Sequence, residues 1–185
     1  KIYNLWNILK HALKPNSISG SKKNISYHYD LGNEFYSKWL DTSMTYSSAL
    51  FESKEDELYT AQNKKYNNLC EITKIKAGDN ILEIGCGWGG FAEFAAKKYK
   101  SNITCITLSK EQAEYAQKRV QKEGLNDLID IKISDYREIN KKYDKIISIE
   151  MFEAVGKRYW PIFFKKLRDN IKDEGIIGMQ VISIK

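Results

Sequence analysis

Short apolar runs alternate with amphipathic segments along the second half of the chain. The runs have the length of strands, and they occupy residues 80–84, 102–108, 129–134, 144–150 and 175–184. Between them, apolar spacing predicts helices that begin at residue 91 and extend over residues 109–124 and 159–175. We expect Ser109 to cap the second of these helices and Gly124 to end it. Repeated strand–helix units predict an α/β, Rossmann-like fold with a mostly parallel sheet flanked by helices.

The first part of the chain has a less regular pattern. Residues 52–69 have the character of a helix, and Gly78 and Asp79 form a turn before the first predicted strand. Residues 25–51 are rich in aromatic side chains and too apolar for a solvated loop, although they follow no regular period. We therefore divide the chain into an N-terminal arm (1–24), an aromatic-rich cover with helices (25–78) and a Rossmann-like core (79–185).

Glycines are concentrated where the first predicted strand passes into the first predicted helix. Gly85, Gly87 and Gly90 satisfy G-x-G-x-x-G, a pattern that suits several adenosine cofactors, including NAD. Glycine allows positive φ and close approach of a ligand, and a helix N-terminus offers unpaired N–H groups. Glu83 and the alternation of Gly85, Gly87 and Gly89 resemble class I S-adenosylmethionine methyltransferases. A tight turn without a ligand is the structural alternative.

The ends of the next two predicted strands offer further contacts. Residues 107–109 end the second strand, with no acid before Glu111. NAD enzymes carry an acid in this region to hold the ribose hydroxyls, so the pattern argues against NAD, and it also departs from many methyltransferases. The third strand ends at Asp135 and Tyr136. This pair suits contacts with an adenine ring or, equally well, a helix cap beside a core tyrosine.

Two acids, Glu150 and Glu153, follow the fourth predicted strand. Their spacing places both side chains on one side of any helical turn formed there. Next to an apolar pocket, a carboxylate can act as a general base or hold one. Both acids also suit a helix N-terminus, where negative charge is favourable. The pattern alone leaves these roles open.

The net charge of +6 is concentrated near the N-terminus, because residues 1–29 contain five lysines and no acid. Apolar residues recur at helical spacing among these lysines, so we expect a basic amphipathic helix. Such a helix binds an anionic membrane surface, and it also suits packing on its own domain or on a second subunit. The remaining chain has no basic stripe of the kind that follows nucleic-acid phosphates, which argues against a nucleic-acid partner.

Length and cysteine usage narrow the class of protein. A chain of 185 residues fits one domain of ordinary size. Cys70, Cys86 and Cys105 lack the paired spacing of a disulfide framework or a zinc site, so we predict no metal. No apolar run approaches the roughly 18 residues needed to span a bilayer, and the N-terminus has no secretory leader. These features predict a cytoplasmic protein that is soluble or attached to a membrane surface.

Six segments, taken together, resemble the cyclopropane-fatty-acyl-phospholipid synthase family and its mycolic-acid relatives. In chain order they are YHYDLGNEFYSKWLD, MTYSSALF, ILEIGCGWGGF, TLSKEQ, EMFEAVG and RYW. The resemblance implies a class I methyltransferase that transfers a methylene group from S-adenosylmethionine to the cis double bond of an unsaturated phospholipid acyl chain, forming a cyclopropane ring. It also implies a sheet truncated after the fifth strand, because such methyltransferases continue beyond it.

The resemblance implies a cofactor site built from several strand ends. From the methionine end to the adenine of S-adenosylmethionine, the expected contacts are Tyr46 and Ser47, Gly85 and Gly87, Thr107, Leu108 and Gln112, and Tyr136 with Arg137. We assign Glu83, which precedes the glycines, to the same site.

Family members use a bicarbonate ion as the base. The resemblance implies that Glu153 and the main chain of Ile149 hold this ion. At two positions of the base site the chain departs from the family. Ser48 replaces a cysteine, Gln180 replaces a histidine, and both replacements keep the capacity to form hydrogen bonds. We expect these four residues to form the catalytic group.

Methyl transfer to an alkene leaves a carbocation that water would trap, so we expect a dry pocket with aromatic faces that attract the cation. The candidates are Tyr27, Tyr29, Phe35, Trp39, Phe152 and Trp160. Two alternatives stay open, namely a related lipid methyltransferase that makes a methyl-branched chain and a catalytically silent S-adenosylmethionine-binding module. In either catalytic case we expect a peripheral protein at the inner membrane face, with a homodimer as a further option.

Overall fold

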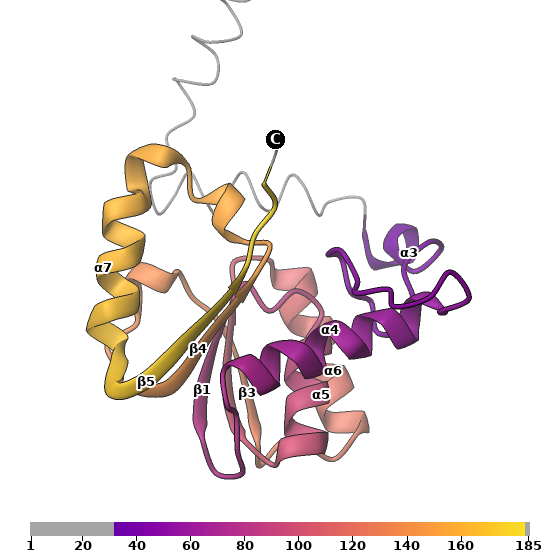
Figure 1. The fold of residues 1–185 in the computed structure, drawn as a ribbon, viewed down its shortest axis with the longest axis horizontal. Coiled ribbons are helices and arrows are strands. Elements are labelled where there is room, and N and C mark those ends of the chain that lie inside the picture. The colour runs from indigo at the N-terminus through magenta and orange to yellow at the C-terminus, as the bar shows by residue number, and fades with distance from the viewer. Residues whose placement is uncertain (1–31, 184–185) are drawn as a thin grey trace, which may run out of the picture.

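A computed structural model describes residues 32–183, so the predicted N-terminal arm lies outside the described residues. Five parallel strands form one sheet in the order β3-β2-β1-β4-β5 (Figure 1). The strands are β1 (Asn80–Ile84), β2 (Asn102–Thr107), β3 (Ile129–Ile133), β4 (Tyr143–Ile149) and β5 (Ile171–Gln180). The predicted parallel sheet is confirmed, and its central strand β1 leads into the glycine-rich turn.

Helices cover both faces of the sheet. They are α3 (Gly32–Tyr36), α4 (Leu58–Ile72), α5 (Gly90–Tyr99), α6 (Lys110–Lys122) and α7 (Trp160–Asn170). Short 3₁₀ turns, η1 to η3, occupy Tyr136–Glu138, Phe152–Ala154 and Lys157–Tyr159. Helices α4, α5 and α6 contribute to the core on one face, and α7 packs on the other (Figure 1). The predicted Rossmann-like layering is therefore confirmed.

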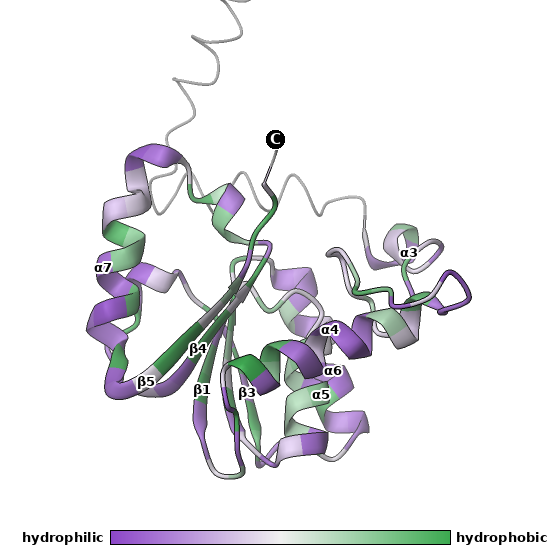
Figure 2. Ribbon diagram, viewed as in Figure 1, coloured by the Kyte–Doolittle hydropathy of each residue, from purple (hydrophilic) through white to green (hydrophobic). Residues whose placement is uncertain are grey.

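Neighbouring residues of β1 point into two separate cores. Ile81 lies in the core that contains Phe91 of α5, whereas Leu82 lies in the core that contains Phe163 of α7. A strand covered on both faces gains from apolar side chains at successive positions, which explains why Ile81, Leu82 and Ile84 are all apolar, with Glu83 as the one buried acid of this strand. Figure 2 shows the central strands as the most hydrophobic part of the fold. The sheet is thus a rigid platform for the residues at its carboxyl edge.

The sequence signals for α6 are confirmed. The Ser109 hydroxyl accepts a hydrogen bond from the Gln112 main-chain N–H at 3.2 Å, which satisfies one of the unpaired donors of the first turn. Gly124 follows the end of the helix with φ of 64°, a conformation that glycine adopts without strain.

Two predicted helix boundaries are wrong. Residues 52–57 are not helical, because the Asp56 carboxylate accepts hydrogen bonds from the main-chain N–H groups of Glu52 and Ser53 and fixes a loop before α4. Residues 171–175, predicted as the end of a helix, belong to β5 instead. Ile171 pairs with Tyr143 across the sheet, and an irregularity in the pairing separates it from the later strand residues.

Within residues 32–183, no helix is both long enough and apolar enough to cross a membrane. The three cysteines are buried and free. The same part of the chain contains no group of three or more His, Cys, Asp or Glu side chains placed to hold a metal ion.

Candidate cofactor and catalytic site

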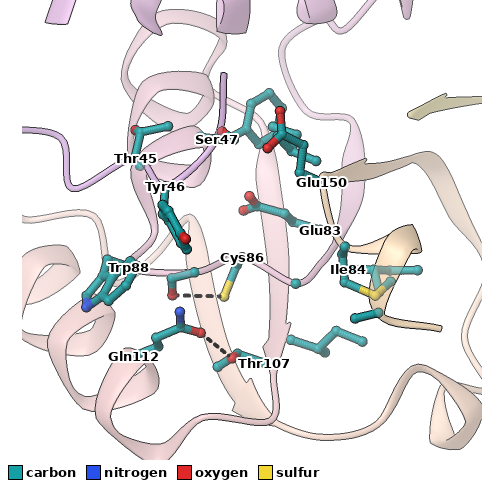
Figure 3. A pocket seen from close by; sticks show the side chains of 18 of the residues that line it. Thr45, Tyr46, Ser47, Glu83, Ile84, Cys86, Trp88, Thr107, Gln112 and Glu150 are labelled. Atoms are coloured by element: carbon teal, nitrogen blue, oxygen red, sulfur yellow. Dashed lines mark hydrogen bonds between the residues drawn. The ribbon is translucent and has the colours of Figure 1, made fainter. Parts of the chain in front are cut away.

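A cavity of about 470 Å³ opens at the carboxyl ends of β1, β2 and β4. Its volume lies in the range of small-molecule sites, and open α/β sheets bind ligands at this edge. We call residues 41–48 the cover segment, since its central part lines the cavity from outside the sheet (Figure 3). The predicted site residues that line this cavity are Tyr46, Ser47, Glu83, Gly85, Gly87, Thr107, Leu108, Gln112, Tyr136, Ile149 and Glu153.

The turn after β1 forms one wall of the cavity. Gly85 and Gly87 have φ angles of 79° and 53°, which favour glycine over any other residue. A Cβ atom on Gly87 would meet no other atom within 4 Å, whereas one on Gly85 would lie 2.6 Å from the Met151 side chain. At Gly87, therefore, only the absence of a side chain leaves the main chain accessible to a ligand.

The end of β2 supplies a polar group beside this turn. The Thr107 hydroxyl donates a hydrogen bond to Oε1 of Gln112 at 2.9 Å, and both residues are buried. This bond fixes the amide orientation, and Figure 3 shows the Gln112 nitrogen pointing into the cavity. Leu108 lines the cavity next to them. The arrangement presents an amide donor of the kind that ribose oxygens accept.

The cavity is lined by a buried acid, Glu83, and a buried base, Lys65, donates to the Ser47 hydroxyl, another part of the lining. Glu83 is almost completely buried, and burial raises the pKa of its carboxyl group to about 8. Burial likewise lowers the pKa of Lys65 on α4 to about 8, although the carboxylates around it favour its charged form. Lys65 Nζ donates a hydrogen bond to the Ser47 hydroxyl at 2.6 Å. Because nearby positive charge favours an ionised carboxylate, Glu83 is suited to a cationic ligand.

Arg119 of α6 fixes the cover segment to the glycine turn. Its guanidinium group donates hydrogen bonds to the carbonyl oxygens of Thr42 at 3.2 Å and Ser43 at 2.8 Å in the cover segment. It donates a third to the carbonyl oxygen of Trp88 at 2.9 Å, and its Nε lies 3.0 Å from Glu93. Charge-assisted bonds of this kind are stronger than neutral ones, so two segments far apart in the sequence are joined here.

Helix α4 holds the same segment from the other side. The hydroxyl oxygens of Thr45 and Tyr66 lie 2.6 Å apart in a buried position, and the Gln62 side-chain amide donates to the Ser47 carbonyl at 2.8 Å. These contacts explain why the cover segment is ordered without a regular period of its own.

At the end of β3, the structure shows the capping alternative for Asp135. Its buried carboxylate accepts a hydrogen bond from the Arg137 main-chain N–H at 2.9 Å and pairs with the Arg137 guanidinium at 2.6 Å. Arg137 is not among the residues that line the cavity, and its adenine contact stays a prediction. Tyr136 lines the cavity, with its ring packed edge-on against Phe163 at 5.1 Å.

The end of β4 contains a residue that the resemblance did not assign. Oε1 of Glu150 accepts hydrogen bonds from the main-chain N–H of Ser48 at 2.9 Å and from its hydroxyl at 2.5 Å. The same oxygen accepts one from the Gln180 amide at 2.8 Å. Ser48 and Gln180 do not line the cavity themselves, whereas Glu150 does. Two predicted catalytic residues are thus brought together around a third that was only a candidate.

Glu153 and Ile149 lie at the same end of the sheet. Both line the cavity, and Oε1 of Glu153 accepts a hydrogen bond from the main-chain N–H of Ile182. The predicted catalytic residues therefore gather around the ends of β4 and β5. Their roles in catalysis stay predictions.

The predicted aromatic pocket residues do not line the cavity within the part of the chain that the structure describes. Phe35 and Trp39 pack with Tyr36 and Tyr46 beside the cover segment. Phe152 and Trp160 stack at 5.0 Å on the other side, next to α7. Tyr27 and Tyr29 lie outside the described residues.

The site fits one of the two expected small molecules. An open main chain at Gly87, a buried acid and an amide donor suit a nucleoside with a cationic tail, as in S-adenosylmethionine. The predicted bicarbonate site does not fit in the same way. The donors of Ser48 and Gln180 that were expected near that ion are directed at the Glu150 carboxylate.

Together, the parallel sheet and the glycine-walled cavity at its carboxyl edge define a class I methyltransferase fold. The family model described as mycolic acid cyclopropane synthetase matches residues 17–185, and the chain belongs to this family.

Individual relatives agree with this assignment. The chain is 42% identical over 163 residues to a probable fatty acid methyltransferase from Pseudomonas putida, covering 87% of this chain and 41% of the relative. It is 40% identical over 158 residues to the cyclopropane-fatty-acyl-phospholipid synthase of Escherichia coli K12, covering 85% and 40%. The structure matches that of mycolic acid cyclopropane synthase CmaA1 complexed with SAH and CTAB with a TM-score of 0.83 at 30% identity, covering 90% of this chain and 56% of that one.

The chain spans about two-fifths of the length of these curated relatives. The matched part includes the predicted cofactor residues and the cluster around Glu150.

Proposed function

We propose that the protein containing this chain transfers a methylene group from S-adenosylmethionine to the cis double bond of an unsaturated phospholipid acyl chain, forming a cyclopropane ring. The observation that carries the proposal is that one cavity is lined both by the glycine turn after β1 and by three carboxylates, Glu83, Glu150 and Glu153. We call the side of the cavity at the ends of β1 and β2 the cofactor wall. The name of the Escherichia coli relative supports the substrate and the product. The SAH complex of the structural neighbour supports the cofactor, since SAH is what S-adenosylmethionine becomes after transfer.

Residues at the ends of β1 and β2 would hold the cofactor. Gly87 gives its main chain, Gln112 its amide and Glu83 a negative charge when ionised. Tyr46 and Ser47 would close the methionine end, because the cover segment is fixed over the cavity by Arg119 and α4. When bound, S-adenosylmethionine supplies an electrophilic methyl group. The chain's task is to orient it and to keep water away from the product cation.

A proton must also leave during ring closure, and this requires a base in the cavity. Bicarbonate is the base that the family resemblance implies. The hydrogen bonds from Ser48 and Gln180 to Glu150 do not favour an additional anion there, so no step is assigned to bicarbonate.

We further propose that the protein works at the inner face of a membrane. Large apolar side chains are exposed on and just after α3, in the cover segment and just after it, and one of them, Tyr46, lines the cavity. They are Phe35, Trp39, Tyr46, Leu50 and Phe51. Exposed apolar groups gathered in one region often mark a contact with another molecule or with lipid. The basic N-terminal arm would add attraction to anionic headgroups.

The test is product analysis with labelled cofactor. The complete protein that carries this chain is incubated with S-adenosylmethionine bearing a CD₃ group and with vesicles of unsaturated phospholipid, and the released fatty acids are analysed by mass spectrometry. A cyclopropane ring retains two of the three deuterium atoms, because one leaves in ring closure. Retention of all three, with the proton lost from a chain carbon instead, would establish the methyl-branched alternative, and the Pseudomonas putida relative is named as a probable fatty acid methyltransferase. SAH binding without any lipid product would establish the catalytically silent module.

A further inference from the structure

The carboxylate of Glu150 contacts Ser48 and Gln180, two of the four residues to which the resemblance assigns the bound ion. We propose that Glu150 is the general base of the reaction and that this protein uses its own side chain instead of bicarbonate. The inference rests on the proposed function, since it assigns the proton-removing group of that reaction. It is drawn from the hydrogen bonds, the cavity lining and the backbone conformation at Glu150.

Ser48 and Gln180, the two residues that depart from the family pattern, both donate hydrogen bonds to Glu150. Three donors from Ser48 and Gln180 converge on Oε1 at 2.5–2.9 Å. Gln180 also donates to the Ser48 hydroxyl oxygen at 2.9 Å, so the two residues fix each other. The two departures from the family pattern are thus explained as one arrangement. A serine and a glutamine hold a carboxylate that belongs to the chain.

The second oxygen of Glu150 remains available. Among residues 32–183, no group donates a hydrogen bond to Oε2, while Oε1 accepts three. Glu150 lines the cavity and is only partly buried. A carboxylate anchored through one oxygen and open at the other has the geometry that a general base requires.

The backbone at Glu150 is held in an unfavourable conformation. Its φ is 46°, in the left-handed region that glycine prefers. The main-chain N–H donates to the Gln180 carbonyl at 2.9 Å, which keeps the strand end in this conformation. A strained non-glycine residue that lines a cavity points to a role for its side chain, because glycine would fit the backbone better.

A bicarbonate ion would compete with Glu150 for the same donors. It would also place a second negative charge beside an existing carboxylate, which is unfavourable in a partly buried site. Lys65 is the nearby cation, and its charge already interacts with both Glu150 and Glu83. The local charges therefore favour one base carboxylate rather than a carboxylate with an ion.

The proton balance is complete with Glu150 alone. The alkene electron pair forms a bond to the methyl carbon as the carbon–sulfur bond breaks, leaving a cation on the second alkene carbon. Oε2 of Glu150 accepts a proton from the transferred carbon, and the released C–H electron pair closes the three-membered ring. The carboxyl group then returns its proton to solvent, so neither an oxidant nor a further ion is consumed.

The test uses Glu150→Gln in the complete protein. Glutamine keeps the size and can still accept the Ser48 hydrogen bonds, but it cannot take the proton. We expect S-adenosylmethionine affinity, measured by calorimetry, to stay within about twofold, since the cofactor wall lies on other strand ends. Turnover should fall by roughly 10²- to 10⁴-fold. Glu114→Gln, an exposed change on α6, is the control and should leave both values unchanged.

Glu150→Gly is the second variant. Glycine adopts the positive φ of this position without strain, so we expect the variant to fold. It removes the carboxylate and leaves space beside Ser48 and Gln180. Added formate or bicarbonate should restore part of the turnover in this variant, with saturation as the vacant donors fill. The same salts should have no effect on Glu150→Gln, whose side chain still fills the space.

The remaining outcomes separate the two proposals. If the unsubstituted protein forms the lipid product and Glu150→Gln keeps full activity, the assignment of the base is wrong and the proposed function stands. Glu153→Gln, made in parallel, then shows whether the neighbouring acid is the base. If the unsubstituted protein transfers no carbon to lipid, the proposed function fails and the base assignment fails with it.

Discussion

The two sides of the cavity are built in different ways. The cofactor wall, at the ends of β1 and β2, consists mainly of main chain and of contacts between residues close in sequence, such as Thr107 and Gln112. The proposed catalytic side, at the ends of β4 and β5, depends on side chains from distant segments, with Ser48 and Glu150 separated by 102 positions. The difference shows which part of a site can change its chemistry. A main-chain wall is kept by the fold, whereas a side-chain cluster is open to substitution.

The largest expected effect is on the cofactor wall. Gly87→Val places a branched side chain in the open space of the cavity and should weaken S-adenosylmethionine binding by more than about 100-fold in calorimetry. Gly124→Val is the matched control, because Gly124 also has positive φ and open space around its Cβ position. Both variants carry backbone strain of about 1–3 kcal/mol. If Gly124→Val loses binding to the same extent, strain and not cavity filling is responsible.

Glu83 tests whether the cofactor wall also depends on a side chain. Its pKa is raised from 4.5 to about 8 by burial, so the folded state retains a proton that the unfolded state loses. The stability linked to this proton is complete below pH 4.5 and is lost as the pH rises from about 4.5 to 8. We expect the free energy of unfolding to fall over this window by an amount on the order of a few kcal/mol.

Denaturant titration of the cofactor-free protein at several pH values measures this change. Glu83→Gln should flatten the pH dependence, because glutamine does not titrate. Lys65, whose pKa is lowered to about 8, acts at higher pH, where stability should rise between about pH 8 and 10.5. An unchanged slope in Glu83→Gln below pH 8 would assign the titration to another group.

The smallest effect is expected at the support of the catalytic side. Ser48→Ala removes the hydroxyl donor to Glu150 but keeps the main-chain donor, so Glu150 stays anchored less firmly. Turnover should fall by about tenfold, which corresponds to about 1.4 kcal/mol and the loss of one charge-assisted hydrogen bond. The cofactor affinity should not change. Ser48→Cys, which restores the residue type of the family, should recover part of the loss, whereas equal losses in both would indicate a packing role.

The difference between the two sides also explains what could be predicted from sequence. The first four strands, α6 and its Ser109 cap follow from local periodicity and local capping chemistry, and they were predicted correctly, whereas the fifth strand, predicted over 175–184, runs from Ile171 to Gln180. The end of α7 was not, because Ile171 gains more from pairing with Tyr143 than from continuing a helix, and that partner lies far away in the chain.

The same reasoning applies to the site. Predicted cofactor residues that follow a strand directly do line the cavity, as Gly87 and Leu108 show. Glu150 was only one of two candidate acids in the sequence, and its contacts with Ser48 and Gln180 could not be predicted, because these partners reach it only through the fold. A signal was nevertheless present. Two departures from the family pattern, Ser48 and Gln180, both supplied neutral hydrogen-bonding groups, and an additional acid stood at a strand end. Only the fold shows that Ser48, Gln180 and Glu150 lie close together.

The most direct test of this account is the bicarbonate dependence of the unsubstituted protein. Lipid product formation is measured in buffer freed of carbon dioxide, with bicarbonate then added back over a range of concentrations at constant pH and ionic strength. If Glu150 is the base, the initial rate is the same with and without bicarbonate. A rate that is low in the depleted buffer and rises to saturation as bicarbonate is added would contradict the account and return the base to a bound ion.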